Sequence, residues 1–380
     1  MVTAASSRRI AQLDTVRGMA ILGIFLLNIF GFALPQAAYL NPYYTSTTSP
    51  SEAYIWVVFN VLFQGKVLAI FSILFGATLA LLQSRTLRWN HCRLFILAIF
   101  GVIHGVLFWD GDILLAYALT GLVAVYLINY YSDRVLLNLA VTIYLVGLVI
   151  LFILGSGVDP SHFWQISAQQ VADEQMVRIA GGIEGVIYRT TEMFIMVEML
   201  VIQYGWQLLA LMVIGALLIK NGWLKGQFSP QHYRKIAKLF IVPALVVQII
   251  ALYAQSQLNW SYFATSIVGY IINELVTPFQ SLGYIALVYG FWGKIQSSKL
   301  VDYLQNVGRM ALSNYILQTL ICTTIFYHLG YFGVFSRVEL LLFIPIIWAI
   351  NLLFSHYWLR VFRQGPLEWC WRTLTEKLYR

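Results

Sequence analysis

Residues 113–130 read ILLAYALTGLVAVYLINY and carry no charged side chain. Because an α-helix rises about 1.5 Å per residue, a run of this length approaches the roughly 30 Å thickness of the hydrocarbon core of a bilayer. The whole chain of 380 residues has the same character, since 60% of its residues are hydrophobic and only 11% are charged. A soluble domain carries about 25% charged residues, so the composition excludes a soluble enzyme and predicts a membrane protein.

Similar apolar runs recur along the chain, and together they predict an all-α, polytopic membrane protein with about ten transmembrane helices. The predicted spans lie at about 17–35, 54–82, 94–109, 113–130, 135–155, 193–219, 236–255, 262–292, 308–327 and 338–359. The second span contains Gln64, Gly65 and Lys66, and the eighth contains Pro278. Both spans are longer than a straight crossing requires, so we expect each to be broken, tilted or re-entrant.

The positive charges predict the orientation of the chain. Of the 24 lysines and arginines, 20 lie in the termini and in the loops at 83–93, 131–134, 220–235 and 293–307, with the adjoining helix ends. Because lysine and arginine accumulate in cytoplasmic loops, both termini are predicted to be cytoplasmic. The net charge of +8 therefore reflects the orientation of the chain in the membrane. No nucleic-acid partner is expected, since the sequence has no basic stripe with interleaved aromatic residues.

We expect a single membrane-embedded domain over residues 1–380, with one external loop at about 156–192. That loop mixes turn residues with amphipathic ones, which is typical of a short interfacial helix above a site. The three cysteines, Cys92, Cys322 and Cys370, lie in different segments without metal-ligand spacing. The sequence therefore predicts neither a disulfide framework nor a bound metal.

Ionisable and amide side chains are costly inside a bilayer, so those within the spans are candidate functional residues. Asp14, Arg17 and Asn28 lie on one face of the first helix, with about 16 Å of rise between Arg17 and Asn28. A structural alternative is that Asp14 and Arg17 form an i, i+3 ion pair that anchors the end of the helix. This alternative does not account for Asn28.

His104 lies near the outer end of the third span and is followed by Asp110, Gly111 and Asp112. An imidazole with carboxylates nearby is the usual equipment of a general base. In one interpretation, a turn at Gly111 brings Asp112 back, and either Asp110 or Asp112 orients His104. In the other, both aspartates cap the next helix and the histidine bonds to a neighbouring helix.

Four further polar residues are candidates for lining a passage: Lys66, Glu274, Asn314 and Gln318. Asn314 and Gln318 recur with Cys322 every four residues, a spacing that suits either a passage or hydrogen bonds between helices. Lys66 and Glu274 either pair with each other or lose their charges through pKa shifts, and the sequence leaves both alternatives open.

Five stretches spread over the chain match a known family. They are Leu13-Asp14-Thr15-Val16-Arg17-Gly18-Met19-Ala20, Phe75-Gly76, the segment 101–115 with His104, Gly308 to Tyr315, and Phe362 to Trp369. These stretches resemble the YeiB-type family of bacterial inner-membrane proteins, also described as domain of unknown function 418. The resemblance implies a multi-pass protein of the bacterial inner (cytoplasmic) membrane.

The element Asp14-x-x-Arg17-Gly18 also resembles a wider superfamily of transmembrane acyltransferases, which includes the acyltransferase-3 family and heparan glucosaminide N-acetyltransferase-like proteins. This resemblance implies that acyl-coenzyme A on the cytoplasmic side donates an acyl group to an acceptor on the periplasmic side. Asn28 stands where the polysaccharide acyltransferases tend to have histidine, and it is similar to the N-acetyltransferase branch. His104 lies on a different helix from that histidine.

Under this hypothesis Asp14 and Arg17 on the first helix, together with Arg309 and Arg363, bind the anionic coenzyme at the cytoplasmic rim. The pantetheine arm follows the polar face of the first helix to Asn28, which stabilises the developing oxyanion together with Gln318. His104 removes a proton from the acceptor hydroxyl or amine.

Two other functions fit the same sequence. A transporter or flippase of a small molecule or lipid would use the intramembrane charges as a substrate pathway. A non-catalytic lipid- or quinone-binding protein would require only the aromatic residues near the interfaces. Membrane lipids are expected partners in every case. The acceptor is left open, and a homo-oligomer is compatible with the sequence, because an interface between protomers would be another apolar helix face.

Overall fold

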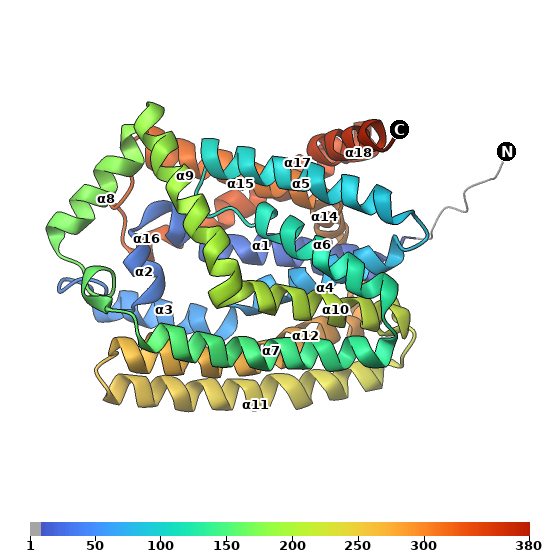
Figure 1. Cartoon of the computed structure of the whole chain (residues 1–380), viewed down its shortest axis with the longest axis horizontal. Coiled ribbons are helices and arrows are strands. Elements are labelled where there is room, and N and C mark those ends of the chain that lie inside the picture. The colour runs from blue at the N-terminus through green and yellow to red at the C-terminus, as the bar shows by residue number, and fades with distance from the viewer. Residues whose placement is uncertain (1–8) are drawn as a thin grey trace.

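The computed structural model describes residues 9–380, in which every regular element is a helix. The longest helices lie side by side along one direction and form a bundle (Figure 1). The start of α1 and the C-terminal α18 lie at one end of the bundle, and α8 lies at the other. We call these the inner end and the outer end, after the orientation that the positive charges predict.

Within the described part of the chain, ten helices or broken helix pairs cross the bundle at the positions that the apolar runs predict. They are α1 (Ala11–Ala33), α3 (Pro50–Leu62) with α4 (Lys66–Leu81), α5 (Leu87–Leu107), α6 (Leu114–Tyr130), α7 (Asp133–Ser156), α10 (Gly205–Lys220), α11 (Pro230–Gln257), α12 (Tyr270–Gly290), α15 (Ala311–Thr323), and α16 (Arg337–Leu340) with α17 (Phe343–Val361). Within residues 9–380, eight of these are long and apolar enough to cross a membrane, whereas α6 has 17 residues and α15 has 13. The protein is therefore a polytopic, all-α membrane protein.

The other helices complete the ends of the bundle. They are α2 (Gln36–Leu40), α8 (Ala168–Ala180), α9 (Gly182–Met199), α13 (Trp292–Ile295), α14 (Lys299–Arg309) and α18 (Pro366–Tyr379), with short 3-10 turns at Pro160–His162 and Trp223–Lys225. The helix expected in the segment 156–192 is α8, which Ser167 and Gln170 begin with a reciprocal capping box. α9 continues through a π-helical turn into α10, so the predicted sixth span begins in α9.

The second predicted span is broken where the sequence indicates. α3 ends at Leu62 and α4 begins at Lys66. Between them Gly65 has a φ of 79°, a backbone conformation that glycine adopts without the steric cost of a side chain. The break leaves carbonyl groups of α3 without partners in their own helix, and these need hydrogen bonds from elsewhere in the bundle.

The eighth span was predicted to be broken, tilted or re-entrant, and the structure shows no break at Pro278. α12 runs from Tyr270 to Gly290 without interruption, and the irregular segment lies earlier, in a π-helical turn at Phe263–Gly269. Proline in a membrane helix is tolerated where neighbouring groups satisfy the freed backbone carbonyl. The proline alone is therefore a weaker helix breaker here than the sequence suggested.

The connection between α5 and α6 turns back into the bundle. A Cβ atom added to Gly101 of α5 would lie 2.3 Å from the backbone nitrogen of Leu115, so the two helices touch at this point. Because α5 continues to Leu107, α6 begins about 9 Å deeper than α5 ends. Figure 1 shows α6 starting inside the bundle rather than at its outer edge. This depth explains why α6 is short, and it carries the residues at 108–113 into the interior.

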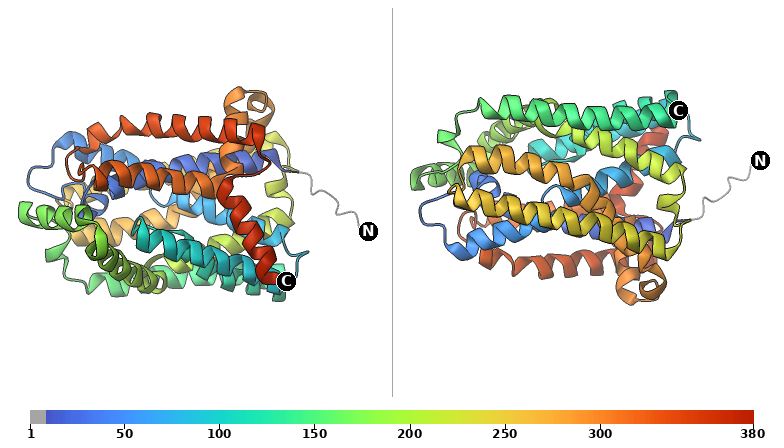
Figure 2. Two further views of the ribbon diagram at one scale, coloured as in Figure 1. Left: turned by 90° about the horizontal axis from the view of Figure 1, so that it is seen from above. Right: turned by 90° about the horizontal axis from the view of Figure 1, so that it is seen from below.

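Two glycines bring α14 against the inner part of α1. A Cβ atom at Gly18 would lie 2.0 Å from the carbonyl oxygen of Leu304, and one at Gly308 would lie 1.9 Å from that of Asp14. Both glycines belong to the motifs that carry the family resemblance. α18 packs against α5 and α15 and lies across the bundle at the inner end (Figure 2, left). α14 and α18 therefore surround the inner ends of α1, α5 and α15.

Candidate functional site

Three buried side chains form a continuous hydrogen-bonded line in the interior. His104 of α5 lies with its Nδ1 atom 2.7 Å from Asp112 Oδ1 and its Nε2 atom 3.0 Å from Thr319 Oγ1 of α15. The side chains of His104 and Asp112 are 2% and 1% exposed, and Thr319 is fully buried. A carboxylate, an imidazole and a hydroxyl are thus arranged as an orienting group, a base and a hydroxyl group that the base can activate.

The turned-back connection positions Asp112. Its second oxygen, Oδ2, accepts a 2.8 Å hydrogen bond from the backbone N–H of Leu115 in the first turn of α6. A carboxylate is favoured there by the unpaired N–H groups and the helix dipole. The two interpretations of Asp112, as a helix cap and as the group that orients His104, both hold. Because an ionised carboxylate only accepts, it places the histidine hydrogen on Nδ1 and leaves the lone pair on Nε2.

Thr319 is the member of the line that sequence reasoning missed. The polar residues singled out on the same span face α17 instead. Asn314 Nδ2 donates to Ser355 Oγ at 2.7 Å, and Gln318 Nε2 donates to Asn351 Oδ1 at 2.6 Å. Asn314 and Gln318 therefore join helices and do not line the cavity described below. Threonine hydroxyls in helices commonly bond to their own backbone, so no sequence signal marks Thr319.

Asp110 belongs to a different contact, at the outer end. Arg178 of α8 donates from Nη1 to Asp110 Oδ1 at 2.8 Å and to the Tyr327 hydroxyl at 3.3 Å, and from Nε to Glu174 at 3.0 Å. Burial alone would lower the pKa of Arg178, but Asp110, Tyr327 and Glu174 raise it well above its usual value. Of the two aspartates expected as alternatives to orient His104, Asp112 makes the contact, whereas Arg178, distant in sequence, holds Asp110.

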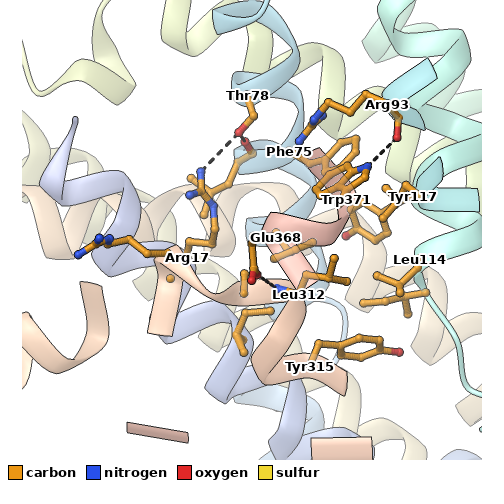
Figure 3. A pocket seen from close by; sticks show the side chains of 18 residues that line it. Arg17, Phe75, Thr78, Arg93, Leu114, Tyr117, Leu312, Tyr315, Glu368 and Trp371 are labelled. Carbon is orange, nitrogen blue, oxygen red and sulfur yellow. Dashed lines mark hydrogen bonds between the residues drawn. The ribbon is translucent and has the colours of Figure 1, made fainter. Parts of the chain in front are cut away.

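A cavity of about 220 Å³ lies between α1, α4, α5, α6, α14, α15 and α18. Arg17, Arg93 and Arg309 line it at the inner end, with Thr78, Glu368 and Trp371. Its opposite part is lined by Ile113, Leu114, Tyr117 and Tyr315. Figure 3 shows Tyr315 and Leu114 lying away from Arg93 and Thr78. The ring of Tyr315 packs on His104 with 5.1 Å between centroids, so a residue of the cavity lining contacts the buried line.

Three arginines define the charge of the cavity, and one of them was not predicted. Arg17 lines it and also pairs with Asp14 at 3.0 Å, so the ion pair of the structural alternative exists beside the cavity. Arg93 lies over the ring of Trp371 at 4.0 Å. Arg93 Nη1 and Arg309 Nε are buried and have no hydrogen-bond acceptor within residues 9–380. Buried donors without partners are rare in native proteins and indicate a place for an anion or water.

Arg363 and Asn28 do not take the places that the sequence predicts. The Arg363 side chain is exposed and outside the cavity lining, and its carbonyl oxygen accepts from Arg309 Nη2 at 3.3 Å. Arg363 lies on the loop before α18, whereas Arg93, in the second turn of α5, lines the cavity. Asn28 is half-buried, and within the described residues it neither forms a hydrogen bond nor lines the cavity.

Glu368 of α18 was also missed, although it lies in a motif of the family resemblance. Its Oε1 atom accepts from the backbone N–H groups of Leu312 at 2.8 Å and of Ser313 at 3.1 Å, at the start of α15. Burial raises the pKa of Glu368 above its usual value, and the bonds from Ser313 and Leu312 oppose this. The carboxylate thus holds α18 against the inner part of the cavity.

Lys66 and its neighbours close the break between α3 and α4. Lys66 is fully buried and donates to Asn60 O at 2.8 Å, to Gln248 Oε1 at 2.6 Å and to Asn273 Oδ1. Side chains of α12 satisfy the other free carbonyls of the break: Gln280 donates to Val61 O at 3.0 Å, Tyr284 to Leu62 O at 3.1 Å, and Asn273 to Gln64 O at 3.3 Å. In a bilayer each carbonyl left alone would cost several kcal/mol, so this polar cluster makes the break possible.

Glu274 lies beside this cluster and bonds to amide and hydroxyl groups. Its carboxylate accepts from Gln207 Nε2 and, at 3.2 Å, from the Tyr144 hydroxyl. Lys66 and Glu274 thus bond to their neighbours, and within residues 9–380 they form no ion pair with each other. No group of three His, Cys, Asp or Glu side chains in the same described range could hold a metal ion.

Comparison with known proteins places the chain in a family. It is 47% identical over 370 residues to "Uncharacterized protein YeiB" of Escherichia coli (strain K12), a match that covers 97% of this chain and 96% of the other. The chain belongs to the YeiB family. The profile described as "Protein of unknown function (DUF418)" matches residues 218–377. "Uncharacterized protein YxaH" of Bacillus subtilis (strain 168) is 30% identical, over 97% of this chain and 95% of its own length. No solved structure matches.

The two kinds of match cover different parts of the site. The DUF418 match at residues 218–377 includes Thr319, Arg309 and Glu368. His104, and with it α5, lies outside that range and inside the match to YeiB, which covers nearly the whole chain. The buried line and the cavity are therefore assembled from both halves of a YeiB-family chain.

Proposed function

We propose that this protein is an acyltransferase of the bacterial inner membrane. It takes an acyl group from acyl-coenzyme A on the cytoplasmic side and delivers it to a hydroxyl or amine of an acceptor on the periplasmic side. One observation carries the proposal: a cavity with three arginines at its inner end reaches Tyr315, and the ring of Tyr315 packs on a histidine that a carboxylate orients.

The cavity suits the arm of a coenzyme thioester better than a whole nucleotide. Its volume of about 220 Å³ is smaller than a typical drug-sized pocket of roughly 300–1,000 Å³. The nucleotide would therefore remain at the inner end, where Arg17, Arg93 and Arg309 offer charged donors to phosphate oxygens. The unpartnered Nη1 of Arg93 and Nε of Arg309 support this, because an unsatisfied buried donor costs about 1–3 kcal/mol and an anion would remove that cost.

The buried line supplies the chemistry that acyl transfer requires. Asp112 holds the hydrogen of His104 on Nδ1, so Nε2 is able to accept a proton from an attacking hydroxyl or amine. The positive charge that then forms on the imidazole lies 2.7 Å from the Asp112 carboxylate, which stabilises it. A positioned base of this kind contributes about 10² to 10⁴ in rate.

The transporter hypothesis depends on Lys66 and Glu274 lining a pathway. The hydrogen bonds of Lys66 serve the break between α3 and α4, which gives that residue a structural role. The cavity, by contrast, lies on another side of α4 and holds none of these residues. The geometry therefore favours acyl transfer over transport.

Binding of the donor tests the proposal directly. The purified protein in detergent is mixed with acetyl-coenzyme A, and the midpoint of thermal unfolding and the release of free thiol are measured. A ligand at 100 times its dissociation constant stabilises a protein by about 2.7 kcal/mol, so a clear upward shift is expected. Coenzyme A without its acyl group should also stabilise but release no further thiol. Absence of any shift at millimolar acetyl-coenzyme A would overturn the proposal.

A further inference from the structure

We propose that Thr319 is the catalytic nucleophile, and that the acyl group crosses the protein as an ester of its hydroxyl. This inference rests on the proposed function and adds a covalent intermediate to it. Thr319 is the one hydroxyl at 3.0 Å from Nε2 of the oriented histidine among residues 9–380. A hydroxyl, a base and a group that orients the base are the three parts that activate serine and threonine nucleophiles.

The direction of the hydrogen bonds suits activation of Thr319. With its hydrogen on Nδ1 bound to Asp112, His104 presents a lone pair at Nε2, and the Thr319 hydroxyl is the group placed to donate to it. The same hydroxyl has a second acceptor, the carbonyl oxygen of Tyr315, at the longer distance of 3.3 Å. The hydroxyl proton therefore has a short path to the base.

Tyr315 links the neighbourhood of Thr319 to the cavity. The two residues are one helical turn apart on the same face of α15, and Tyr315 lines the cavity, whereas Thr319 is buried outside the lining. The Tyr315 hydroxyl donates a long hydrogen bond of 3.3 Å to the carbonyl oxygen of Gly111. In the proposed mechanism this ring rotates away from Gly111, which opens a path between the hydroxyl of Thr319 and the end of the cavity, where the thioester arrives.

The first step transfers the acyl group to Thr319. The hydroxyl oxygen attacks the thioester carbonyl carbon while its proton moves to His104 Nε2. The carbon–sulfur bond breaks, and the departing coenzyme A thiolate takes the proton from the imidazolium. The products are a threonine ester and a free thiol, so atoms and charges balance without an oxidant or a further reactant.

The second step releases the acyl group to the acceptor. An acceptor hydroxyl or amine gives its proton to His104 and attacks the ester carbonyl, and the Thr319 oxygen leaves with that proton. His104 lies next to Trp109 and the Asp110–Arg178 contact of the outer end, so the acceptor approaches from that side. The ester explains how a donor from one side and an acceptor from the other react without sharing one cavity.

The test is to trap the ester without knowing the acceptor. The full-length protein is mixed with acetyl-coenzyme A alone, quenched in acid, and analysed by peptide mass spectrometry and by thiol release. We expect one acetyl group per chain on Thr319 and a matching burst of thiol. Thr319→Val should reduce the burst by about 10²-fold or more, and Thr319→Ser should retain it.

Thr323 provides a matched control. It is also buried on α15, one turn after Thr319, and its hydroxyl donates to the Thr319 carbonyl at 2.8 Å. Thr323→Val should leave both the burst and the acetylated peptide unchanged, and comparison of the unfolding midpoints of the two valine variants excludes a general loss of folding.

The outcomes separate the two proposals. If acetyl-coenzyme A stabilises the protein but no acetyl group forms on Thr319, or if Thr319→Val keeps the burst, the Thr319 ester is overturned and the proposed function stands. If acetyl-coenzyme A neither stabilises the protein nor releases thiol, both proposals are overturned.

Discussion

The two buried polar regions of the bundle differ in how their cationic side chains are satisfied. The ammonium of Lys66 meets three oxygen atoms, from α3, α11 and α12. Beside the cavity, Arg93 Nη1 and Arg309 Nε meet none within residues 9–380. A buried charge with complete hydrogen bonds is explained by the fold itself, whereas unsatisfied donors next to a cavity call for a ligand. We therefore assign a structural role to the region around Lys66 and a chemical role to the region beside the cavity.

The largest effect is expected from His104. His104→Ala removes the base, so acyl transfer should fall by about 10² to 10⁴ while stabilisation by acetyl-coenzyme A remains. Rates of thiol release and unfolding midpoints measure the two properties separately. His91→Ala, at an exposed position on the same helix, is the control and should keep full activity. Full turnover by His104→Ala would show that the histidine only packs, and the region beside the cavity would then lose its assigned chemical role.

The opposite pattern is expected from Lys66. Lys66→Met leaves the oxygen atoms of Asn60, Gln248 and Asn273 without their donor, which should lower the free energy of unfolding by about 2–4 kcal/mol. Affinity for acetyl-coenzyme A should not change. Lys238→Met, on an exposed position of α11, should alter neither property. Loss of coenzyme affinity in the folded Lys66→Met protein would join the two regions into one site and contradict the distinction drawn between them.

A pair of arginine variants sharpens the boundary of the donor site. Arg93→Met removes a charged donor from the cavity and should weaken binding of acetyl-coenzyme A about 10-fold or more, since a hydrogen bond to a charged group contributes about 1.5–3 kcal/mol. Arg363→Ala removes an exposed arginine that faces away from the cavity and should leave the affinity nearly unchanged. Isothermal titration measures both. The reverse ranking would restore the sequence-based assignment of Arg363.

The smallest effect is expected from pH at Glu368. Burial raises its pKa, so between the ordinary pKa of a glutamate and the raised value the folded protein binds more protons than the unfolded chain. The stabilising contribution of the protonated group is therefore present at low pH and is lost as the pH rises through the raised value. Unfolding midpoints of the wild type should fall relative to Glu368→Gln over that range. If the difference between the unfolding midpoints of the wild type and Glu368→Gln is the same at every pH, the pKa of Glu368 is the same in the folded and unfolded protein, which contradicts the prediction.

Some site residues could be predicted because their signals are local. His104 and Asp112 are eight positions apart, and a turn at Gly111 that returns Asp112 to the histidine was one of the two interpretations of the sequence. The break at Gly65 was also visible, because the polar residues around it interrupt an apolar run. For Asn314 and Gln318 the sequence left two roles open, and the structure shows the hydrogen bonds between helices. A polar side chain within a span has the same signature whether it joins helices or lines a cavity.

The amino-acid sequence by itself determined the membrane class and the positions of the crossing helices, and it predicts their orientation, because apolar runs and the distribution of positive charge act one segment at a time. Only the tertiary structure decided that Thr319 meets His104, that Arg93 rather than Arg363 faces the cavity, and that Arg178 holds Asp110. These contacts join segments from 68 to more than 200 residues apart. Their formation depends on which faces of the helices pack together. In an apolar bundle many helix faces are equally apolar, so the sequence does not show which of them meet.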